Sequence, residues 1–540
     1  MPEIKLEHIN KRWDKFYAVE DLNMTIGDNA FVTLLGPSGC GKTTTLRMIA
    51  GLETPTSGRI TIGDRVVFDS DTGINVPPNK RKVGFLFQNY ALWPNMTVYQ
   101  NISFGLTNVK EEMEKVDFEA KTDAQLAAIL SKPAEAAAVI EECRDKKGRL
   151  DEQKAIIKLI DNYTISQYTA KKILALHPEN GGDFSAKVSE LEAKVEAAVK
   201  AGNLNENFEF TENGEVVKVV RKLSKEEIDL AVRRVSRIVK ISMFMDRYPA
   251  ELSGGQQQRV AIARTLAPEP SVLFMHEPLS NLDAKLRLEM RYELQRLHVE
   301  TGSTFVYVTH DQMEAMTLAT QICLINNGVL QQYEAPLTVY SEPENTFVAD
   351  FVGNPSINFV EAKGSQIGSG KISLTMFGGI KAEFTPNNDF SLEQWFENRD
   401  AEAEAAAAEL QEKAAQKGYV ENGNKDEVFR YHISKVEDED DALAEDPVIT
   451  NEDFVLGIRP EFIGIDNDGR IDGEIYGAMP TGMESTVKIR VGEFLLTGVV
   501  FGSTLFSIGE KVKVAVNGNM VMLFDRKSGK RICNGSLEIV

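Results

Sequence analysis

The chain has 540 residues, a length that suggests about three domains of roughly 150 residues each. Its apolar fraction of 42% and charged fraction of 26% are ordinary for a soluble globular protein. The formal net charge of -21 contrasts with the basic stripe expected of a duplex-binding protein, so we expect no nucleic acid partner.

The cysteines and the chain start bear on the compartment. Cys40, Cys143, Cys323 and Cys533 lie far apart and form no CxxC pair, which predicts free thiols in a reducing cytoplasm. The first residues lack the apolar stretch of a signal peptide. A bilayer span needs a continuous run of about 20 apolar residues, and the sequence has no such run. Any membrane role is therefore expected to work through a partner.

Residues 1–106 alternate short apolar strands with glycine-rich turns, which is an α/β pattern. The motif described next makes them the predicted first part of a nucleotide-binding core. The apolar residues 31–35 predict a short buried strand. A glycine-rich turn follows directly, and then a helix is expected to start near Lys42.

That turn fits the phosphate-loop pattern GxxxxGK[ST] between a strand and a helix. The glycines let backbone N–H groups turn inward around phosphate oxygens, and the helix adds its positive N-terminal end. Lys42 would reach the β- and γ-phosphates, and the Thr43 hydroxyl would ligate Mg²⁺. The competing interpretation is a glycine-rich turn without a ligand. The predicted phosphate-binding set is Gly36, Pro37, Ser38, Gly39, Cys40, Gly41, Lys42, Thr43 and Thr44.

Residues 107–222 are rich in Ala, Lys and Glu and predict a mainly helical insertion. Val188, Leu191, Val195 and Val199 recur at helical spacing, and Gly202 stands where that helix would end. Asn213-Gly214 lies between two strand-like runs and predicts a hairpin.

Residues 223–345 return to the α/β texture and contain a second glycine motif at 252–259, Leu-Ser-Gly-Gly-Gln-Gln-Gln-Arg. Ser253 is a natural N-cap for the apolar helix that follows, and Gly254 and Gly255 allow close backbone approach. Together with Gln256 they predict a second phosphate-binding helix N-terminus.

Short β patterns dominate residues 355–540 and predict a β-barrel. Alternation at 487–491 and at 512–516 indicates half-buried strands of that barrel. A low-complexity insertion near 388–450 interrupts them. It contains an Ala/Glu helix at 401–418 with a Glu409–Lys413 pair, and an acidic run, 437–446, of a kind that is usually disordered.

With both glycine motifs in place, the sequence resembles the ABC transporter ATPases, whose signature motif matches residues 252–259. The resemblance implies ATP and Mg²⁺ as cofactors. It also implies that the signature of one subunit closes on the ATP held by the phosphate loop of the other, in a homodimer or heterodimer with two composite sites.

Further residues match this family in the same order along the chain. The resemblance implies that Trp13 stacks on adenine, the alternative being a core tryptophan. It implies that Gln88 belongs to a loop that senses Mg²⁺ and faces the permease, and that Glu277 is the general base for the attacking water. It implies that Asp283 belongs to the loop that crosses the dimer interface, and that His310 is the switch histidine at the γ-phosphate.

Three further segments and a GIRPE motif are similar to one branch, the sugar and glycerol-phosphate importer ATPases. This resemblance implies a P-loop core with a helical subdomain and a C-terminal OB-like regulatory barrel. It also implies integral-membrane permease partners, an extracellular solute-binding protein as an indirect partner, and a place at the cytoplasmic face of the membrane. Phe462 stands where a histidine is more usual. The branch-specific segments are 89–94, 311–316, 347–355 and 457–461.

His276 departs from the family, which has an aspartate before Glu277. That carboxylate normally supports Mg²⁺, whereas neutral imidazole offers one acceptor nitrogen and no negative charge. One interpretation is reduced but real activity, since Lys42, Glu277 and His310 are all present. The other is a nucleotide-binding regulatory subunit with little turnover. A site for a softer metal at His276 lacks a second His or Cys nearby in sequence.

Two other questions stay open. The insertion at 107–222 is either a tolerated surface decoration or an extra docking element for a membrane partner or regulator. A soluble ABC ATPase of DNA repair or translation is the rival function, although the single signature, the negative charge and the barrel motif at Arg459-Pro460 argue against it.

Overall fold

The computed structural model describes residues 2–107, 110–145, 148–367, 370–415, 429–436, 448–466, 469–502 and 504–540. Its contacts divide the chain into two compact units, residues 1–81 with 302–540, and residues 82–301. The cysteines are free thiols, as predicted. None of the helices in the described ranges combines the length and apolar character that a bilayer crossing requires.

Parallel strands around β3 (Phe31–Leu35) form the part of the first unit that is predicted to bind nucleotide. β3 pairs in parallel with β13 (Thr304–Val308) and with β14 (Gln321–Asn326). Every residue of β3 and β13 is buried, as expected for parallel strands covered on both faces. Because their carboxyl ends share an edge, the loops after β3 and β13 emerge side by side. The other elements here are β15 (Val329–Glu334), α1 (Lys42–Ala50), α11 (Gln312–Leu318), α12 (Pro336–Ser341) and α13 (Thr346–Phe351).

An antiparallel sheet with the order β2-β1-β4-β5-β6 also belongs to this unit. β1 and β2 form its hairpin, in which Trp13 and Phe16 are the last paired residues. The strands are β1 (Ile4–Trp13), β2 (Phe16–Ile26), β4 (Ser57–Ile62), β5 (Arg65–Asp69) and β6 (Ile74–Asn75).

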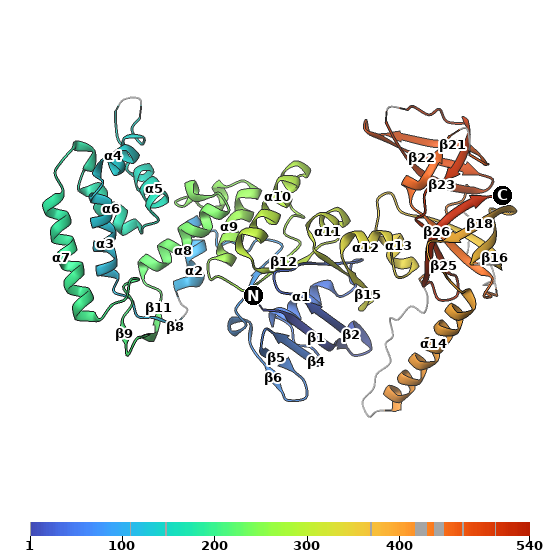
Figure 1. Ribbon diagram of the computed structural model, residues 1–540, viewed down its shortest axis with the longest axis horizontal. Helices are drawn as coiled ribbons and strands as arrows, with labels where there is room; N and C mark the ends of the chain where they lie inside the picture. Colours follow the sequence, from blue (N-terminus) through green and yellow to red (C-terminus); the bar gives the residue numbers. More distant parts are fainter. Residues whose placement is uncertain are drawn as a thin grey trace. The chain divides into compact units, whose positions relative to one another are not determined.

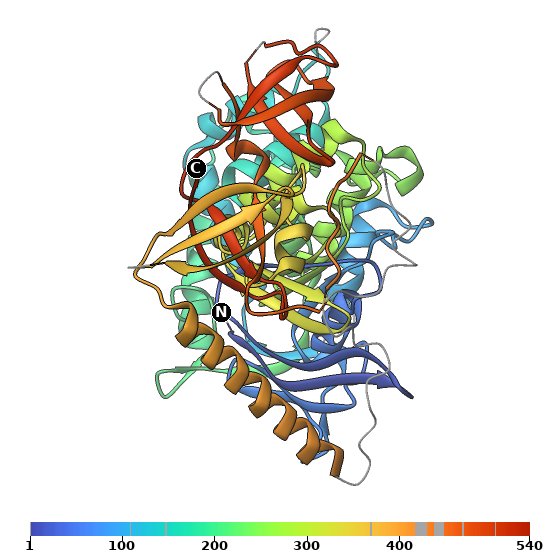
Figure 2. The same ribbon diagram turned by 90° about the vertical axis from the view of Figure 1, so that its right-hand side faces the viewer.

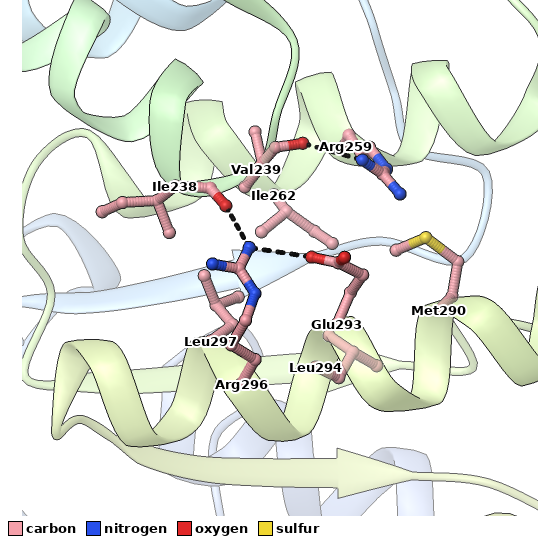
Figure 3. A pocket seen from close by; sticks show the side chains of 9 residues that line it. All are labelled: Ile238, Val239, Arg259, Ile262, Met290, Glu293, Leu294, Arg296 and Leu297. Atoms are coloured by element: carbon pink, nitrogen blue, oxygen red, sulfur yellow. Dashed lines mark hydrogen bonds and ion pairs between the residues drawn. The ribbon is translucent and has the colours of Figure 1, made fainter.

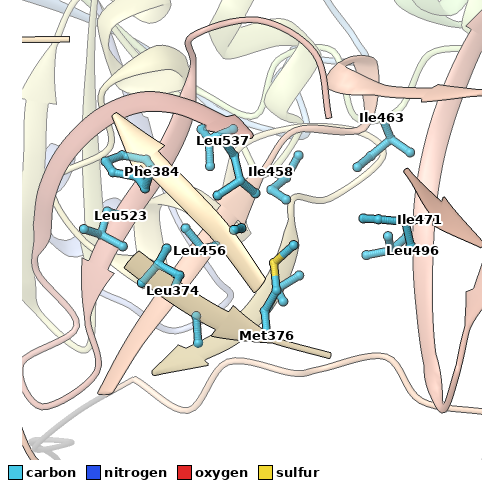
Figure 4. Packing of buried hydrophobic residues seen from close by; sticks show 14 of the residues in the cluster. Leu374, Met376, Phe384, Leu456, Ile458, Ile463, Ile471, Leu496, Leu523 and Leu537 are labelled. Carbon is cyan, nitrogen blue, oxygen red and sulfur yellow. The ribbon is translucent and has the colours of Figure 1, made fainter. Parts of the chain in front are cut away.

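A closed barrel confirms the predicted C-terminal β domain. Its buried core includes Leu374, Phe384, Leu456 and Leu523 (Figure 4). In order around the barrel, the strands are β16 (Asn358–Ile367), β17 (Lys371–Met376), β18 (Ile380–Pro386), β26 (Arg531–Ile539), β25 (Val521–Asp525) and β19 (Asp453–Ile458).

The strands predicted at 487–491 and 512–516 exist, but they lie in a separate five-stranded sheet and not in the closed barrel. The alternation is as expected, since Val487, Ile489 and Val491 are buried between exposed charges. Alternation reports one buried face, which an open sheet packed on a barrel has as well. The sheet contains β20 (Ile463–Ile465), β24 (Lys511–Val516), β21 (Ile471–Pro480), β22 (Glu484–Val491) and β23 (Phe494–Phe501).

The Ala/Glu helix begins earlier than expected, since α14 spans Leu392–Ala415. Its first turns carry Leu392, which packs in the barrel core, and Arg399, which pairs with Asp525 on a barrel strand, whereas residues 401–412 are exposed. The rest of α14 extends away from the barrel (Figures 1 and 2). The acidic run at 437–446 and the Glu409–Lys413 pair lie outside the described residues or side chains.

The second unit contains a parallel pair, β7 (Val83–Leu86) with β12 (Val272–His276), in which Leu86 lies opposite Met275. The loops that follow these strands therefore leave from the same edge. Helix α9 (Gly254–Leu266) packs against β7, and α2 (Val98–Thr107) and α8 (Lys225–Ile238) pack against α9. The unit also contains α10 (Ala284–Thr301).

The segment predicted as an insertion forms a helical module with its own core, built from residues such as Leu126, Ile140, Leu159 and Leu191 (Figure 1). An antiparallel ribbon of β8 (Lys110–Glu114) with β11 (Lys218–Lys222) closes it, so that its chain ends meet where Lys110 pairs with Lys222. The helices are α3 (Phe118–Leu130), α4 (Pro133–Glu141), α5 (Glu152–Tyr163), α6 (Gln167–Ala175) and α7 (Ser185–Gly202).

The predicted hairpin in this module is confirmed. β9 (Thr211–Glu212) pairs antiparallel with β10 (Glu215–Val216), and Asn213 and Gly214 have φ of 53° and 86°. Positive φ at both central positions is what a two-residue hairpin turn of type I′ requires.

The helical module is fixed to α8 by polar contacts. The Gln167 backbone N–H, in the first turn of α6, donates to Asp229 Oδ2 at 2.8 Å. Asp229 is buried on α8 and lies 3.5 Å from the Arg233 guanidinium. Burial, together with the charge of Asp229, raises the pKa of Tyr99 on α2 to about 12. The module is therefore joined to α8 by a buried contact as well as by its ribbon.

Candidate functional site

The phosphate loop owes its shape to glycines. Gly36, Gly39 and Gly41 all have positive φ, at 147°, 82° and 105°. A Cβ on Gly41 would lie 2.1 Å from the Ala18 carbonyl oxygen, and one on Gly36 would lie 2.1 Å from that of Ile325. Only glycine fits these two positions, and α1 then begins at Lys42 as predicted.

Lys42 is folded into this loop. Its Nζ donates to the Gly36 and Pro37 carbonyl oxygens, both at 2.7 Å, and the side chain is buried. Phosphate oxygens would offer the ammonium group stronger, charged acceptors in place of these carbonyls. Ser38 and Gly39 are exposed at the loop tip, and Thr43 and Thr44 in the first turn of α1 are partly buried.

His310 lies beside this loop. It follows β13, whose last residues pair with β3, and the Thr309 N–H donates to the Leu34 carbonyl oxygen at 3.4 Å. The buried Glu314 accepts hydrogen bonds from Tyr307 Oη at 2.7 Å and from Thr309 Oγ1 at 2.8 Å. These bonds fix the segment, and His310 itself is exposed.

Trp13 is not a core residue, because 49% of its surface is exposed. Its ring stacks on that of Phe16 with centroids 6.5 Å apart, and Lys11 Nζ lies 5.2 Å from its centre. An exposed aromatic pair at the end of a hairpin offers a flat surface on which a base could stack.

The second unit brings together two predicted site residues, Gln88 and Glu277, where β7 and β12 end. Gln88 Nε2 donates to Glu277 Oε2 at 3.0 Å and lies 3.5 Å from Ser280 Oγ. Asn281 Nδ2 donates to the Gln88 carbonyl oxygen at 3.1 Å. Glu277 itself has a φ of 45°, a left-handed conformation of the kind that clusters at active sites.

His276 is the last residue of β12 and is partly buried, directly before Glu277. In the described parts of the chain, no group of three or more His, Cys, Asp or Glu residues is placed to hold a metal ion. A site for a softer metal at His276 therefore gains no support.

The signature motif starts α9 with a capping box. Ser253 Oγ accepts from the Gln256 N–H at 3.4 Å, and Gln256 Oε1 accepts from the Ser253 N–H at 2.9 Å. This confirms Ser253 as the N-cap. Ser253, Gly254 and Asp283 are exposed, whereas Gly255 is buried against Leu286.

Sequence reasoning missed two residues that hold the loop around Gln88. Arg264 on α9 donates to the carbonyl oxygens of Tyr90 and Ala91, and Tyr90 Oη donates to the Pro278 carbonyl oxygen at 3.3 Å. The local signal was an arginine among the apolar residues of α9, but its partners lie more than 170 residues away.

A cavity between α8, α9 and α10 is a packing gap. Its volume is about 10 Å³, room for a single water molecule. Arg296 reaches across it, donating from Nη2 to the Ile238 carbonyl oxygen at 2.6 Å and to Glu293 Oε2 at 2.8 Å (Figure 3). It is too small for a nucleotide.

The ABC transporter family profile matches residues 19–155 and 169–280. The match runs into the segment 107–222 from both sides and leaves out only residues 156–168 between its two parts.

Three relatives are similar over most of their length. The trehalose/maltose import ATP-binding protein MalK of Thermococcus litoralis is 30% identical over 540 residues, covering 98% of this chain and 100% of that protein. The sn-glycerol-3-phosphate import ATP-binding protein UgpC of Brucella abortus is 32% identical, covering 76% and 85%. The spermidine/putrescine import ATP-binding protein PotA of Aster yellows witches'-broom phytoplasma is 36% identical, covering 66% and 74%.

Proposed function

The chain belongs to the ABC transporter family as an ATP-hydrolysing subunit, and we propose that it powers uptake of a sugar or glycerol-phosphate-type solute. It works at the cytoplasmic face of a membrane, bound to separate permease subunits. The solute is chosen by the permease and by an extracellular binding protein, in keeping with relatives named for trehalose/maltose, glycerol-3-phosphate and spermidine/putrescine.

The hydrogen bond between Gln88 and Glu277 carries the proposal. An amide and a carboxylate meet at 3.0 Å where β7 and β12 end, with the carboxylate on a residue in a strained conformation. Such a carboxylate is oriented to accept a proton from an attacking water, which is the work of a general base in ATP hydrolysis.

The phosphate loop supplies binding. Lys42 leaves the Gly36 and Pro37 carbonyl oxygens and turns to the phosphates, where its positive charge stabilises the charge that develops during hydrolysis. The loop N–H groups and the start of α1 surround the phosphates, Trp13 stacks on adenine, and His310 contacts the γ-phosphate.

Mg²⁺ would be held by Thr43 and Gln88, which offer a hydroxyl and an amide carbonyl oxygen. The family resemblance assigns both residues to this role, and each offers the kind of hard oxygen ligand that this ion prefers. The ion, when bound, offsets phosphate charge. His276 contributes no such oxygen.

Two copies, or this chain and a similar one, form the dimer. The exposed Ser253, Gly254 and Asp283, with Gly255 and Gln256, face the ATP of the other subunit. ATP binding closes the dimer and pulls on the permease, and hydrolysis opens it again. Residues 107–222 form a separate module on the helical part of this core.

Phosphate release by the purified chain, together with co-purification of its permease, tests the proposal. We expect Mg²⁺-dependent release that Lys42→Ala abolishes, and membrane subunits in the purified complex. Copurification with nucleic acid or ribosomes instead would support the rival hypothesis, a soluble ABC ATPase of DNA repair or translation.

The second candidate is a regulatory subunit that binds ATP with little turnover, favoured by His276. His276→Asp restores a carboxylate beside the metal's water shell and should raise the hydrolysis rate and lower the Mg²⁺ midpoint by about 10- to 100-fold. Release measured against Mg²⁺ concentration decides. If the native chain is inert and the Asp variant active, the binding-only function is correct; if the two behave alike, His276 has no part in holding the metal.

A further inference from the structure

The loop after Gln88 contains a turn that its own residues disfavour. Tyr90 and Ala91 are consecutive and have φ of 59° and 45°, the left-handed region that residues with a Cβ rarely adopt. Ala91 is exposed and has little side chain of its own to hold it there. The Tyr90 and Ala91 N–H groups close the turn locally, on the Phe87 and Asn89 carbonyl oxygens at 3.0 and 2.6 Å, and contacts from elsewhere add to these bonds.

Arg264 supplies two of these contacts. Its Nη2 donates to the Tyr90 carbonyl oxygen and its Nη1 to the Ala91 carbonyl oxygen, both at 2.6 Å. The planar guanidinium group can engage two neighbouring acceptors at once, which the ammonium group of a lysine cannot do in the same geometry. Charge-assisted bonds of this length are among the stronger ones in proteins.

Arg264 belongs to α9, the helix that the signature motif starts. Three turns separate it from the N-cap Ser253, and its side chain is partly buried, so burial lowers the pKa of its guanidinium group. On its other side the same loop is bound to the segment after β12, through Tyr90 Oη with the Pro278 carbonyl oxygen and Asn281 with the Gln88 carbonyl oxygen.

We propose that Arg264 is a positioning residue that makes the glutamine loop and the signature helix α9 move as one body. The consequence of this link rests on the proposed function, in which Gln88 lies at the ATP site of its own subunit and Ser253 lies at the ATP site of the partner. Arg264 then links the two ATP sites of the dimer within each subunit.

Hydrogen exchange of the loop amides, residues 87–93, tests the link in the full chain without nucleotide. Arg264→Met should speed this exchange at least about tenfold, since two charge-assisted hydrogen bonds are lost. Arg234→Met is the matched control, because Arg234 forms an exposed ion pair with Glu269 on the same unit. Unchanged exchange in Arg264→Met, or an equal rise in Arg234→Met, overturns the proposal.

Turnover provides a second readout that a merely structural role would not move. Arg264→Met should lower kcat about tenfold or more with little change in KM for ATP, since a misplaced catalytic loop costs rate. Adding Ala91→Gly should restore little of the rate, because glycine adopts the left-handed turn unaided but makes no bond to α9. Full recovery of the rate in the double variant overturns the proposal.

The two proposals fail in distinguishable ways. A chain without phosphate release contradicts the proposed function alone, because loop exchange needs no turnover. If Arg264→Met does not fold, Arg264→Lys takes its place. Intermediate exchange is then expected, and exchange equal to that of the native chain overturns the proposal.

Discussion

The phosphate loop and the glutamine loop reach the same kind of backbone conformation by different means. In the first, the left-handed positions are Gly36, Gly39 and Gly41, which adopt them without cost from a Cβ. In the second they are Tyr90 and Ala91, held by Arg264 and by a tyrosine hydroxyl. The glycine loop meets its left-handed positions without a Cβ penalty, whereas the other loop uses bonds to the helix α9 in addition to its own backbone bonds.

The largest effect should come from placing a Cβ in the first loop. Gly41→Ala forces contact with the Ala18 carbonyl oxygen at a φ of 105°, and a displaced loop should weaken ATP binding about 100-fold or more. Titration with ATP measures the affinity. Gly73→Ala is the control, since Gly73 also has positive φ but nothing lies within 4 Å of its Cβ position. Equal affinities in the native chain and Gly41→Ala would contradict the glycine argument.

A change outside the phosphate loop should spare binding. Ser253→Arg should lower turnover about 100-fold or more, the scale of losing a transition-state contact, because Ser253 serves the partner's ATP. Affinity of the monomeric subunit for ATP should stay within about twofold, since binding resides in the first loop. Ser253→Ala separates loss of the helix cap from the added bulk and charge. Lost affinity in the monomer would refute the assignment.

Removing the helical module should have a smaller effect. Its ends meet at Lys110 and Lys222, so a short Gly/Ser linker in place of residues 108–222 can close the gap. Asp229 loses the Gln167 N–H, and a fall in Tm of a few degrees is expected, roughly what one lost hydrogen bond costs. ATP affinity should stay within about threefold. An insoluble or non-binding product would make the module part of the core.

The smallest effect is expected from the reverse substitution in the second loop. Ala91→Gly removes left-handed strain of about 1–2 kcal/mol and adds unfolded-state entropy worth about 0.4–1 kcal/mol. The free energy of unfolding should rise by about 1 kcal/mol or less, which denaturant titration measures. A clear fall would show that Ala91 is not strained in this turn.

The features predicted correctly from the sequence are those that depend on residues close together along the chain. The phosphate loop, the Ser253 cap and the Asn213-Gly214 turn depend on residues within a few positions of each other, and the structure has all three as expected. The role of Arg264 was not predicted, because it depends on hydrogen bonds to two carbonyl groups that lie 173 and 174 residues away in the sequence. The strands at 487–491 and 512–516 were assigned to the wrong sheet, since alternation reports a buried face and not its neighbour.

The pairing of β3 has a consequence for synthesis on the ribosome. The strands that pair with it, β13 and β14, both follow the helical module in the sequence. The Asn29 N–H, just before β3, donates to the hydroxyl of Thr304, which is made 275 residues later. At about 5–20 residues per second, the phosphate-loop strand stays incomplete for roughly 15–55 s. An apolar strand exposed for that long is a natural target for chaperones, and every residue added to the module lengthens the wait.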